Sequence, residues 1–392
     1  MRVLMVIPQA FYSTRGTPLS AYHRTKDLLE LGHEVEILTY PVGDPPPGID
    51  VPVHRSAGPH FAKRIKQGPS RLKIWFDFLL FVNLLYRLLR KRYDVVYAHE
   101  EGAFIYVLLA PLFRLPLIYD MHSSLPLQIS DWEFSKRKLV VDLFGWVERV
   151  SIRRAVAVIA ISPGVARAAK EAHFPANVIT IVNRFEVDER ATPDDGRRIR
   201  RELGIGPDRK VVLYTGSFVA LQALDLLIES IPKVAARVLG VQFVLVGGRQ
   251  EEIDALVPLA DDVGATPHLK MLLARPQSEM PAFMEASDVL VSPRIKGINP
   301  PGKLFSYLSS ERPVVATDCP IHNQLLDHSF AILTRPDAES FADGIVRALV
   351  DRPHVERLIE EARRVLRERF NPEANQAAYR ELFRALESSR TA

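Results

Sequence analysis

The chain has 392 residues, a length at which two domains are a more natural expectation than one large core. Hydrophobic residues make up 47% of the sequence and charged residues 25%, which fits a soluble globular protein. The single cysteine, Cys319, excludes an intrachain disulfide framework and favours a reducing compartment.

Charge is divided unevenly along the chain. Residues 1–185 hold 24 Lys and Arg against 16 Asp and Glu, whereas residues 186–392 hold 27 against 31. A basic first half and an acidic second half indicate that the two halves meet different partners.

The first half predicts short apolar strands that alternate with helices. Residues 2–7 form the first predicted strand, since this apolar run is too short for a secretory signal. A helix follows over residues 19–31 and ends at Gly32, a residue type that often caps helix C-termini. The later strands are continuous β-branched runs, as expected for parallel strands covered on both faces. They lie at residues 34–39, 94–99, 116–122, 155–162 and 178–182.

Residues 72–93 predict a helix that is apolar almost all round. Its longest uncharged run, residues 78–86, is far shorter than the roughly 20 residues that a bilayer-spanning helix needs. Basic residues precede and follow it, a pattern that suits contact with an anionic membrane surface through residues 63–92. A buried helix with solvated ends fits the pattern equally well. The basic residues are Lys63, Arg64, Lys66, Arg71, Lys73, Arg87, Arg90, Lys91 and Arg92.

The second half repeats the alternation of strands and helices. One helix is predicted at residues 225–239, and the charged end of the chain, residues 353–387, is predicted to be helical. The predicted strands lie at residues 210–216, 241–248, 268–273, 288–293 and 313–318.

Two doubly wound α/β domains with parallel sheets and right-handed crossovers account for both halves. Their boundary is expected within residues 186–207, a charged stretch without a long apolar run. We therefore expect one Rossmann-like domain over residues 1–185, a second over residues 186–370, and a C-terminal helix over residues 371–392 that packs back towards the first. A central cleft between two such domains is a common ligand site, because loops at the strand carboxyl ends face it.

The most informative stretch is residues 288–318, which predict a strand, a loop, a helix over residues 303–310 and a second strand. Backbone N–H groups are free at a helix N-terminus, and the helix dipole favours anions there. Lys303 lies in the first turn of this helix, and Arg294 and Asn299 flank the same loop. The loop is therefore a candidate phosphate site, although an ordinary βαβ connection could carry the same pattern.

Two common nucleotide-binding motifs are missing from the sequence. Neither half carries the Gly-x-Gly-x-x-Gly fingerprint of dinucleotide-binding domains or the Gly-Lys-Ser/Thr phosphate loop. These absences count against a nicotinamide-dependent dehydrogenase and against an ATPase. No aromatic-studded strand or recognition motif accompanies the basic residues, so nucleic acid is not an expected partner either.

Several short motifs follow one another along the chain. They are RGTP at residues 15–18, GHEV at 32–35, YDMHS at 119–123, AISPGV at 160–165, LYTGSF at 213–218 and KLFSYLSSERPVVATD at 303–318. In this order they resemble the retaining glycosyltransferases of family 4, which have the GT-B architecture. The resemblance covers nearly the whole chain, and the ordered set is more specific than any single motif.

The candidate donor region departs from the usual family pattern. The family has two glutamates eight residues apart; the second would fall at Ser306, and neither that position nor the earlier one is acidic. The Arg and Lys that usually hold the donor diphosphate would fall at Ser217 and Gln222. Residues 297–303 resemble a branch of the family in which a Gly-x-Asn-x-Pro-x-Lys loop replaces the glutamate pair. The chain is thus either an enzyme of that branch or a catalytically impaired relative.

The resemblance implies a retaining glycosyltransferase that moves a sugar from a nucleotide-sugar donor, UDP- or GDP-linked, to a glycan, lipid-linked or small-molecule acceptor. Cations and backbone N–H groups would stabilise the leaving diphosphate, so neither a metal nor a cofactor is expected. Because such enzymes often build lipid-linked or cell-surface glycans, we expect a cytoplasmic protein, peripheral at the inner face of the membrane. The alternative is an impaired sugar-nucleotide-binding or scaffold protein of the same fold. An epimerase or phosphorylase of this architecture has less support from the residues.

The resemblance also assigns roles to individual residues. His122 is the catalytic candidate, with Asp120 two residues earlier on the same face of its strand. His99 and Glu100 end another strand at the same sheet edge and are acceptor-side candidates, whereas a plain strand-end histidine is the alternative for His122. The donor-binding candidates, with Gly216 and Ser217 as backbone and hydroxyl donors, are Gly16, Thr17, Gly216, Ser217, Gln222, Arg275, Arg294, Asn299 and Lys303.

Overall fold

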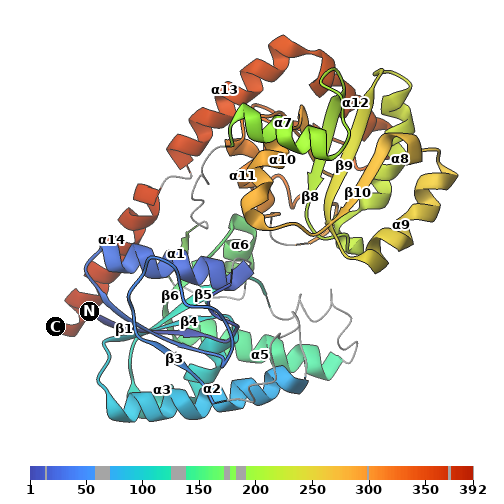
Figure 1. The fold of residues 1–392 in the computed structure, drawn as a ribbon. Coiled ribbons are helices and arrows are strands. Elements are labelled where there is room, and N and C mark those ends of the chain that lie inside the picture. The colour runs from blue at the N-terminus through green and yellow to red at the C-terminus, as the bar shows by residue number, and fades with distance from the viewer. Residues whose placement is uncertain are drawn as a thin grey trace. The chain divides into compact units, whose positions relative to one another are not determined.

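The structure is a computed structural model that describes residues 1–13, 16–57, 71–124, 138–171, 177–181, 191–297, 300–369 and 372–391. It divides into two units (Figure 1). The first combines Met1–Arg184 with Pro372–Ala392, and the second is Phe185–Asn371. Each unit is a parallel sheet covered by helices, so the predicted fold class of two doubly wound α/β domains is confirmed. Among the described helices, none combines the length and the apolar character needed to cross a membrane.

The first unit is built on a parallel sheet whose strands run in the order β3-β2-β1-β4-β5-β6-β7. The strand order reverses at β1, which pairs with β2 on one side and β4 on the other. In doubly wound sheets, ligands bind outside the carboxyl ends of the strands at such a reversal. The strands are β1 (Arg2–Ile7), β2 (Glu34–Thr39), β3 (Val53–Arg55), β4 (Val95–His99), β5 (Leu117–Met121), β6 (Ala155–Ala160) and β7 (Asn177–Thr180).

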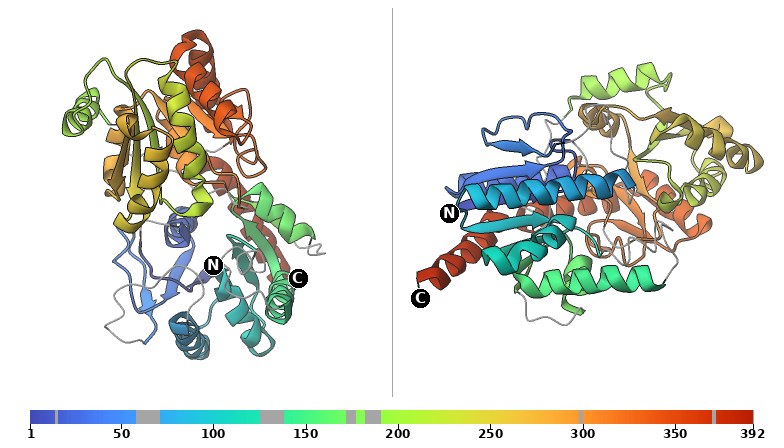
Figure 2. Two further views of the ribbon diagram at one scale, coloured as in Figure 1. Left: turned by 90° about the vertical axis from the view of Figure 1, so that its right-hand side faces the viewer. Right: turned by 90° about the horizontal axis from the view of Figure 1, so that it is seen from below.

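Helices cover both faces of this sheet (Figure 1, Figure 2). The connection from β1 to β2 moves across the sheet in one direction, whereas the connections from β3 through β4 and β5 to β6 move in the other. Right-handed connections therefore put α1 on one face of the sheet and α2, α3 and α5 on the other. The C-terminal helix α14 packs beside α1, where Tyr379 and Phe383 join the apolar core. The helices are α1 (Gly16–Glu30), α2 (Arg71–Arg90), α3 (Glu101–Phe113), α5 (Lys138–Arg154), α6 (Pro163–Glu171) and α14 (Pro372–Thr391).

The second unit repeats this architecture with a sheet in the order β10-β9-β8-β11-β12-β13. The reversal falls between β8 and β11, so the loops after these two strands meet at one edge of the sheet. The strands are β8 (Lys210–Thr215), β9 (Val241–Gly248), β10 (Leu269–Leu273), β11 (Val289–Ser292), β12 (Val314–Thr317) and β13 (Ile332–Thr334). The helices are α7 (Pro193–Glu202), α8 (Leu224–Ala235), α9 (Gln250–Asp262), α10 (Met280–Glu285), α11 (Lys303–Ser309), α12 (Ala338–Val350) and α13 (Arg352–Arg369), with 3₁₀ turns η1 (Ala220–Gln222), η2 (Thr266–His268) and η3 (Gln277–Glu279).

The central strands are buried, as their continuous apolar sequences predict. Every residue of β4 and of β5 is buried. A parallel strand without polar alternation is stable between two layers of helices, because neither of its faces meets water. His99 and Asp120 are polar residues in these two strands, and both lie towards the carboxyl end, where the ligand site of such a sheet is expected.

Several predicted helices have different bounds in the structure. The first helix begins at Gly16, three residues earlier than predicted, with Pro18 in its first turn, where proline is tolerated. Helix α8 ends at Ala235 instead of residue 239. The helical character predicted for residues 353–387 is confirmed. This stretch divides into α13 and α14, and α14 starts at Pro372, because proline begins a helix readily but disrupts its interior.

Short elements escaped the sequence analysis. Helix α7 lies in the stretch expected as the domain boundary, where Thr192 and Asp195 form a capping box. The buried residues of α7 are Gly196 and Ile199, too few for a recognisable apolar period. Strands β3 and β13 have three residues each, a length at which no period-two pattern is visible.

Candidate active site

Asp120 is a fully buried carboxylate near the carboxyl end of β5. Its Oδ2 lies 3.2 Å from Nε of Arg24, a fully buried residue of α1. The Tyr97 hydroxyl of β4 donates to the same oxygen at 2.8 Å and lies 2.9 Å from the Tyr379 hydroxyl of α14. Arg24 also donates to the carbonyl of Ile181 at 2.6 Å. One carboxylate thus links two helices and two strands of the first unit.

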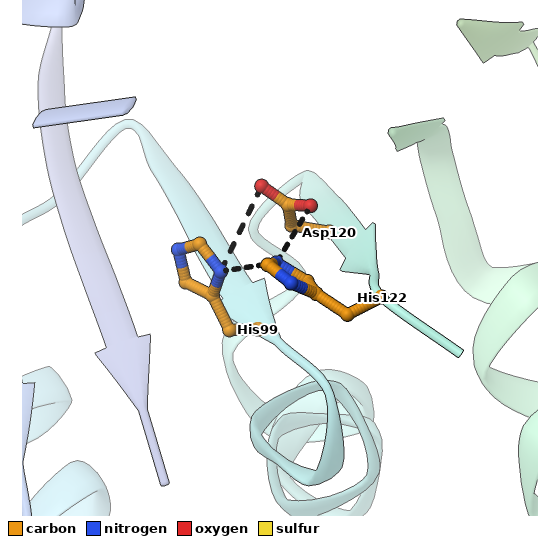
Figure 3. A group of neighbouring side chains, drawn as sticks. All are labelled: His99, Asp120 and His122. Atoms are coloured by element: carbon orange, nitrogen blue, oxygen red, sulfur yellow. Dashed lines mark hydrogen bonds and ion pairs between the residues drawn. The ribbon is translucent and has the colours of Figure 1, made fainter. Parts of the chain in front are cut away.

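Two histidines complete this cluster (Figure 3). Nε2 of His122 lies 3.2 Å from Oδ1 of Asp120, and Nδ1 of His99 lies 3.7 Å from Oδ2. The imidazoles approach each other to 3.3 Å between His99 Nδ1 and His122 Nε2. They meet because β4 and β5 are adjacent and parallel, with His99 opposite Asp120 in register. The structure therefore brings together three residues that the sequence analysis placed at one sheet edge.

The electrostatics of the cluster favour an ionised Asp120 and a neutral His99. Burial alone would raise the pKa of Asp120, but the Arg24 guanidinium, as the largest opposing influence, holds that pKa well below its usual range. Burial lowers the pKa of His99 to about 3, against the opposing influence of Asp120. A carboxylate compensated in this way is a poor proton acceptor, and its chemical use is to orient the neighbouring imidazole.

The same three side chains offer a donor set that bears on metal binding. One ligand atom from each of His99, Asp120 and His122 lies within 4.8 Å of the others. Two histidines and a carboxylate suit a divalent transition metal. However, the buried Arg24 guanidinium already pairs with this carboxylate, and its positive charge would repel a cation at short range. The arrangement fits a hydrogen-bonded charge cluster better than a metal centre.

Glu100 lies beside this cluster, between β4 and α3. It is buried, and its φ of 45° is uncommon for a residue with a side chain. The Ser123 hydroxyl donates to its Oε1 at 3.2 Å. Burial, reinforced by the neighbouring Glu101, raises the pKa of Glu100 well above its usual range. A carboxyl group that keeps its proton can donate a hydrogen bond to a ligand, which is the chemistry an acceptor-side residue needs.

Gly16 and Thr17 are the first two residues of α1 and not part of a loop. Gly16 has a φ of +58°, which a residue without a side chain adopts readily. The Ser20 hydroxyl donates to the Gly16 carbonyl at 3.4 Å. Arg15, which opens the RGTP motif, lies outside the described residues. The glycine is therefore explained locally by its backbone conformation.

In the second unit, Lys303 is the first residue of α11, after the loop that follows β11. Its Nζ is shielded from solvent and has no hydrogen-bond partner in the described parts of the chain. The amine lies 3.5 Å from the ring centroid of Tyr214 and 5.9 Å from that of Tyr307. Burial and the nearby Arg294 hold the pKa of Lys303 well below its usual range. Such an amine is unfavourable unless a ligand supplies the missing negative charge.

Gly216 and Ser217 follow β8 at the strand reversal. Gly216 has a φ of +138°, and a Cβ built on it would lie 3.7 Å from Nζ of Lys303. Its N–H already donates to the Val246 carbonyl at 2.8 Å, so Gly216 is not the free backbone donor we expected. A Cβ at this position would lie 3.0 Å from the Tyr214 hydroxyl, so only glycine fits this turn without a shift. Ser217 is exposed, and its carbonyl accepts a hydrogen bond from the Tyr214 hydroxyl at 2.9 Å. The structure thus brings the Gly216 turn and Lys303 together.

The remaining predicted donor residues have different surroundings. Gln222, in η1, keeps its Oε1 shielded from solvent without a hydrogen-bond partner within the described ranges. Arg294 is half-buried in the loop after β11. Arg275 follows the edge strand β10, away from the strand reversal, and Glu202 already pairs with it at 2.5 Å. Asn299 lies outside the described residues.

Arg24 is a central residue of the first cluster that the sequence analysis missed. It lies on α1 three residues after Ala21 and four before Leu28, both buried. A charged residue on the apolar face of a helix is expected to have a buried partner of opposite charge. This signal was present in the sequence. Tyr97, by contrast, looks like any other aromatic residue of a buried strand.

His322 is a second missed residue, in the second unit. It is fully buried, and its Nε2 lies 3.0 Å from the Ser292 hydroxyl at the end of β11. Burial lowers the pKa of His322 to about 4. Its Nδ1 lies 3.0 Å from the Thr317 hydroxyl, which in turn lies 2.5 Å from the Arg294 carbonyl. This network anchors the start of the loop that leads to Lys303.

Solved structures of other proteins have the same fold as this chain. Sucrose-phosphate synthase from Thermosynechococcus elongatus superposes with a TM-score of 0.78 at 16% identity, covering 99% of each chain. Anabaena HepE, solved in complex with UDP-glucose, gives a TM-score of 0.73 at 19% identity over 98% of this chain and 100% of that one. These likenesses show a protein of the GT-B class and confirm the predicted architecture.

The family follows from the sequence match. Residues 16–184 match the family described as "Glycosyl transferase 4-like domain", and residues 209–351 match "Glycosyl transferases group 1". The chain therefore belongs to the glycosyltransferases that join these two domains. Alpha-D-kanosaminyltransferase from Streptomyces kanamyceticus is 26% identical over 279 residues, which are 68% of this chain and 71% of that protein. The predicted glycosyltransferase family is confirmed, and its branch without paired glutamates stays a prediction.

Proposed function

We propose that this glycosyltransferase is a retaining enzyme that uses a nucleotide-sugar donor, and that Lys303 holds the donor diphosphate. The observation that carries the proposal is the Nζ of Lys303 beside the Gly216 turn, which is shielded from solvent and has no hydrogen-bond partner among the described residues. This amine lies at the strand reversal of the second sheet, the usual ligand position in a doubly wound domain.

A diphosphate has the charge that this site lacks. The Tyr214 ring compensates the Lys303 amine only in part, since a cation–π contact is weaker than a charge-assisted hydrogen bond. A phosphate oxygen in contact with Nζ would restore both a charge partner and a hydrogen bond. The missing side chain at Gly216 leaves room for that approach.

In the proposed reaction, the bond between the anomeric carbon and the diphosphate oxygen breaks, and a bond to the acceptor hydroxyl oxygen forms. Negative charge accumulates on the leaving diphosphate, and the acceptor hydroxyl gives up its proton to an oxygen of that diphosphate. Lys303, protonated when the diphosphate is bound, stabilises this charge in a site shielded from water. Metal independence is part of the proposal, because the lysine takes the role that a metal ion would otherwise have.

His122 is the proposed catalytic residue of the first unit. Asp120, fixed by Arg24, orients the imidazole through the contact with Nε2. We assign His122 a hydrogen bond to the donor sugar or the acceptor instead of base chemistry, because in a retaining reaction the departing diphosphate can itself accept the acceptor proton. His99 and Glu100 are proposed on the acceptor side of the same cluster.

The donor nucleotide is proposed to be UDP, with GDP as the alternative. HepE, which shares the fold, was solved with UDP-glucose, and this supports the choice. The related kanosaminyltransferase, by its name, transfers a sugar, and this supports sugar transfer as the reaction class. The acceptor is proposed to be a glycan, a lipid-linked sugar or a small molecule.

A catalytically impaired sugar-nucleotide-binding or scaffold protein is the second candidate. The observation in its favour is the sequence of the donor region, where Ser217, Gln222 and Ser306 stand in place of the family's Arg, Lys and Glu. A protein that has lost these groups could keep nucleotide binding without turnover.

Incubation of the purified chain with a panel of UDP- and GDP-sugars separates the two candidates. An enzyme slowly releases free nucleotide even without an acceptor, and we expect this release to disappear in Lys303→Ala and to persist in EDTA. Lys233→Ala is the matched control, because Lys233 is exposed on α8 and pairs with Glu339. Binding without release, across glycan and lipid extracts as acceptors, would identify the scaffold. Release that survives Lys303→Ala would refute the placement of the diphosphate.

A further inference from the structure

Helix α2 carries apolar side chains on both its inner and its outer face. Its inner stripe repeats every four residues and is buried against the sheet, at Phe76, Leu80, Leu84 and Leu88. Its outer stripe follows the same helical spacing but is exposed, at Trp75, Phe78, Val82, Tyr86 and Leu89. A surface helix normally presents charged or polar residues outward. The outer stripe of α2 therefore needs an explanation beyond packing on its own sheet.

Two neighbouring helices continue this apolar surface. Helix α3 lies between α2 and α5 on the same face of the sheet (Figure 2). Leu108 and Leu112, one turn apart on α3, are 72% and 69% exposed. Leu143 and Trp146 of α5 are exposed as well. We call these outward side chains together the α2–α3–α5 face. Exposed apolar patches that extend over several elements mark interaction sites.

Basic residues lie at one end of this face. In consecutive βαβ units the helices run antiparallel to the strands, so the C-terminal ends of α2, α3 and α5 lie at the same edge of the sheet. Arg90 and Arg92 lie at the end of α2, Arg114 caps α3, and Arg154 ends α5; all four are exposed. The Arg90 guanidinium lies 5.2 Å from the Tyr86 ring centroid, which joins the basic edge to the aromatic stripe.

Acidic side chains are nearly absent from the surface of these three described helices. Glu148 is buried, Glu101 pairs with Lys73, and Asp77 pairs with a tyrosine hydroxyl. Asp142 on α5 is the acidic residue of these helices that is exposed. The face thus offers apolar and aromatic contacts bordered by positive charge.

We propose that the α2–α3–α5 face binds an anionic lipid surface peripherally, with its aromatic side chains at the headgroup boundary and its arginines on the phosphates. Trp and Tyr favour that boundary, and basic residues beside them are attracted to anionic headgroups. A dimer through this face would offer the arginines of each copy little negative charge, because Asp142 is the exposed acidic residue among the described residues of these helices. The proposal does not depend on the transferase activity.

Co-sedimentation of the full chain with vesicles tests this proposal. Vesicles of phosphatidylcholine alone are compared with vesicles of phosphatidylcholine and phosphatidylglycerol in equal parts. We expect binding to the anionic vesicles only, and weaker binding at high salt. The double variant Arg90→Glu with Arg92→Glu should lower the partition coefficient by roughly thirtyfold or more, about fivefold for each charge lost. Trp75→Ser with Trp146→Ser should lower it by about tenfold or more.

Matched controls come from the second unit. Leu239→Ser with Val350→Ser removes two exposed apolar side chains, and Arg201→Glu reverses one exposed charge. These controls should bind like the unmodified chain, and circular dichroism should show that all variants are folded. Absence of binding to anionic vesicles, or equal losses in the controls, would overturn the proposal. So would a stable dimer in solution that the tryptophan variant dissociates, since the face would then be an interface between copies.

Discussion

Asp120 in the first unit and Lys303 in the second are both ionisable side chains in shielded positions, but their surroundings differ. Asp120 contacts the Arg24 guanidinium, the Tyr97 hydroxyl and the His122 imidazole, all within the protein. The Lys303 amine has an aromatic ring beside it and no hydrogen-bond partner in the described structure. A compensated charge belongs to the framework that orients other groups, whereas a shielded ionisable group without a counter-charge indicates where a ligand binds.

Replacing the compensated charge should have the largest effect. Asp120→Asn leaves the buried Arg24 guanidinium without its counter-charge, and we expect about 3 to 5 kcal/mol of destabilisation at neutral pH. Because the pKa of Asp120 is depressed in the folded chain, the stability that its ionised form contributes is fully present above the ordinary carboxyl pKa. That stability is lost as the pH falls towards the lowered pKa of Asp120. Urea denaturation followed by circular dichroism measures the change.

The exposed Asp142→Asn on α5 is the control for this experiment. It should change the free energy of unfolding by less than about 0.5 kcal/mol. Equal stabilities for the two variants would mean that the Asp120 cluster does not hold the first unit together.

His122→Ala tests whether the compensated cluster serves catalysis. We expect kcat to fall by about a hundredfold while the affinity for the nucleotide stays the same, since His122 acts on the reacting sugar or acceptor and not on the diphosphate. His328→Ala, at an exposed histidine of the second unit, is the control. Equal losses of kcat and affinity would count against the proposed role.

Lys303→Met tests the second of the two side chains, the one without a counter-charge. A methionine keeps the apolar stem and removes the buried amine, which has no hydrogen-bond partner among the residues described, so the chain should become more stable by about 1 kcal/mol. The same change should weaken UDP binding by about 2 kcal/mol, because it deletes a charge-assisted hydrogen bond. Thermal unfolding and a binding titration measure the two effects. A variant that is less stable and binds UDP normally would show that Lys303 is a framework residue like Asp120.

The smallest effect is expected at the edge of the first cluster. Tyr379→Phe removes the hydroxyl that lies 2.9 Å from that of Tyr97, at a cost of about 1 kcal/mol in stability. Turnover should change little, because the Tyr97 hydroxyl still donates to Asp120. Tyr86→Phe on the outer surface of α2 is the control and should be neutral in unfolding experiments. A larger loss of turnover than of stability would place Tyr379 closer to the chemistry than we infer.

The sequence predicted the framework well for a physical reason. Continuous runs of β-branched residues are typical of parallel strands that are buried on both faces, so the long strands could be recognised in the sequence. Strand ends also carry the candidate residues, and adjacent parallel strands bring His99 and Asp120 to one edge. The position of Lys303 at the start of a helix was readable from the loop before it.

Partners distant in sequence could not be predicted. Arg24 and Asp120 are 96 residues apart, and nothing local names one as the partner of the other. The N–H of Gly216 was expected to be a free donor, but its bond to Val246 appears only once β8 and β9 are paired. Likewise, the sequence showed that α2 is apolar on all sides, and only the structure shows that Trp75 and its stripe point outward.

The central claim is that a diphosphate binds the Lys303 amine, and calorimetry of UDP-glucose binding tests it most directly. Because the pKa of Lys303 is lowered in the free chain and a bound diphosphate would raise it, binding should take up a proton. The affinity for UDP-glucose should therefore be greatest at a pH below the pKa of Lys303 in the free chain. It should weaken as the pH rises towards the higher pKa of Lys303 in the complex. Titrations in buffers of different ionisation enthalpy should show this proton uptake in the unmodified chain and not in Lys303→Met. Proton-neutral binding of equal affinity in both proteins would contradict the account.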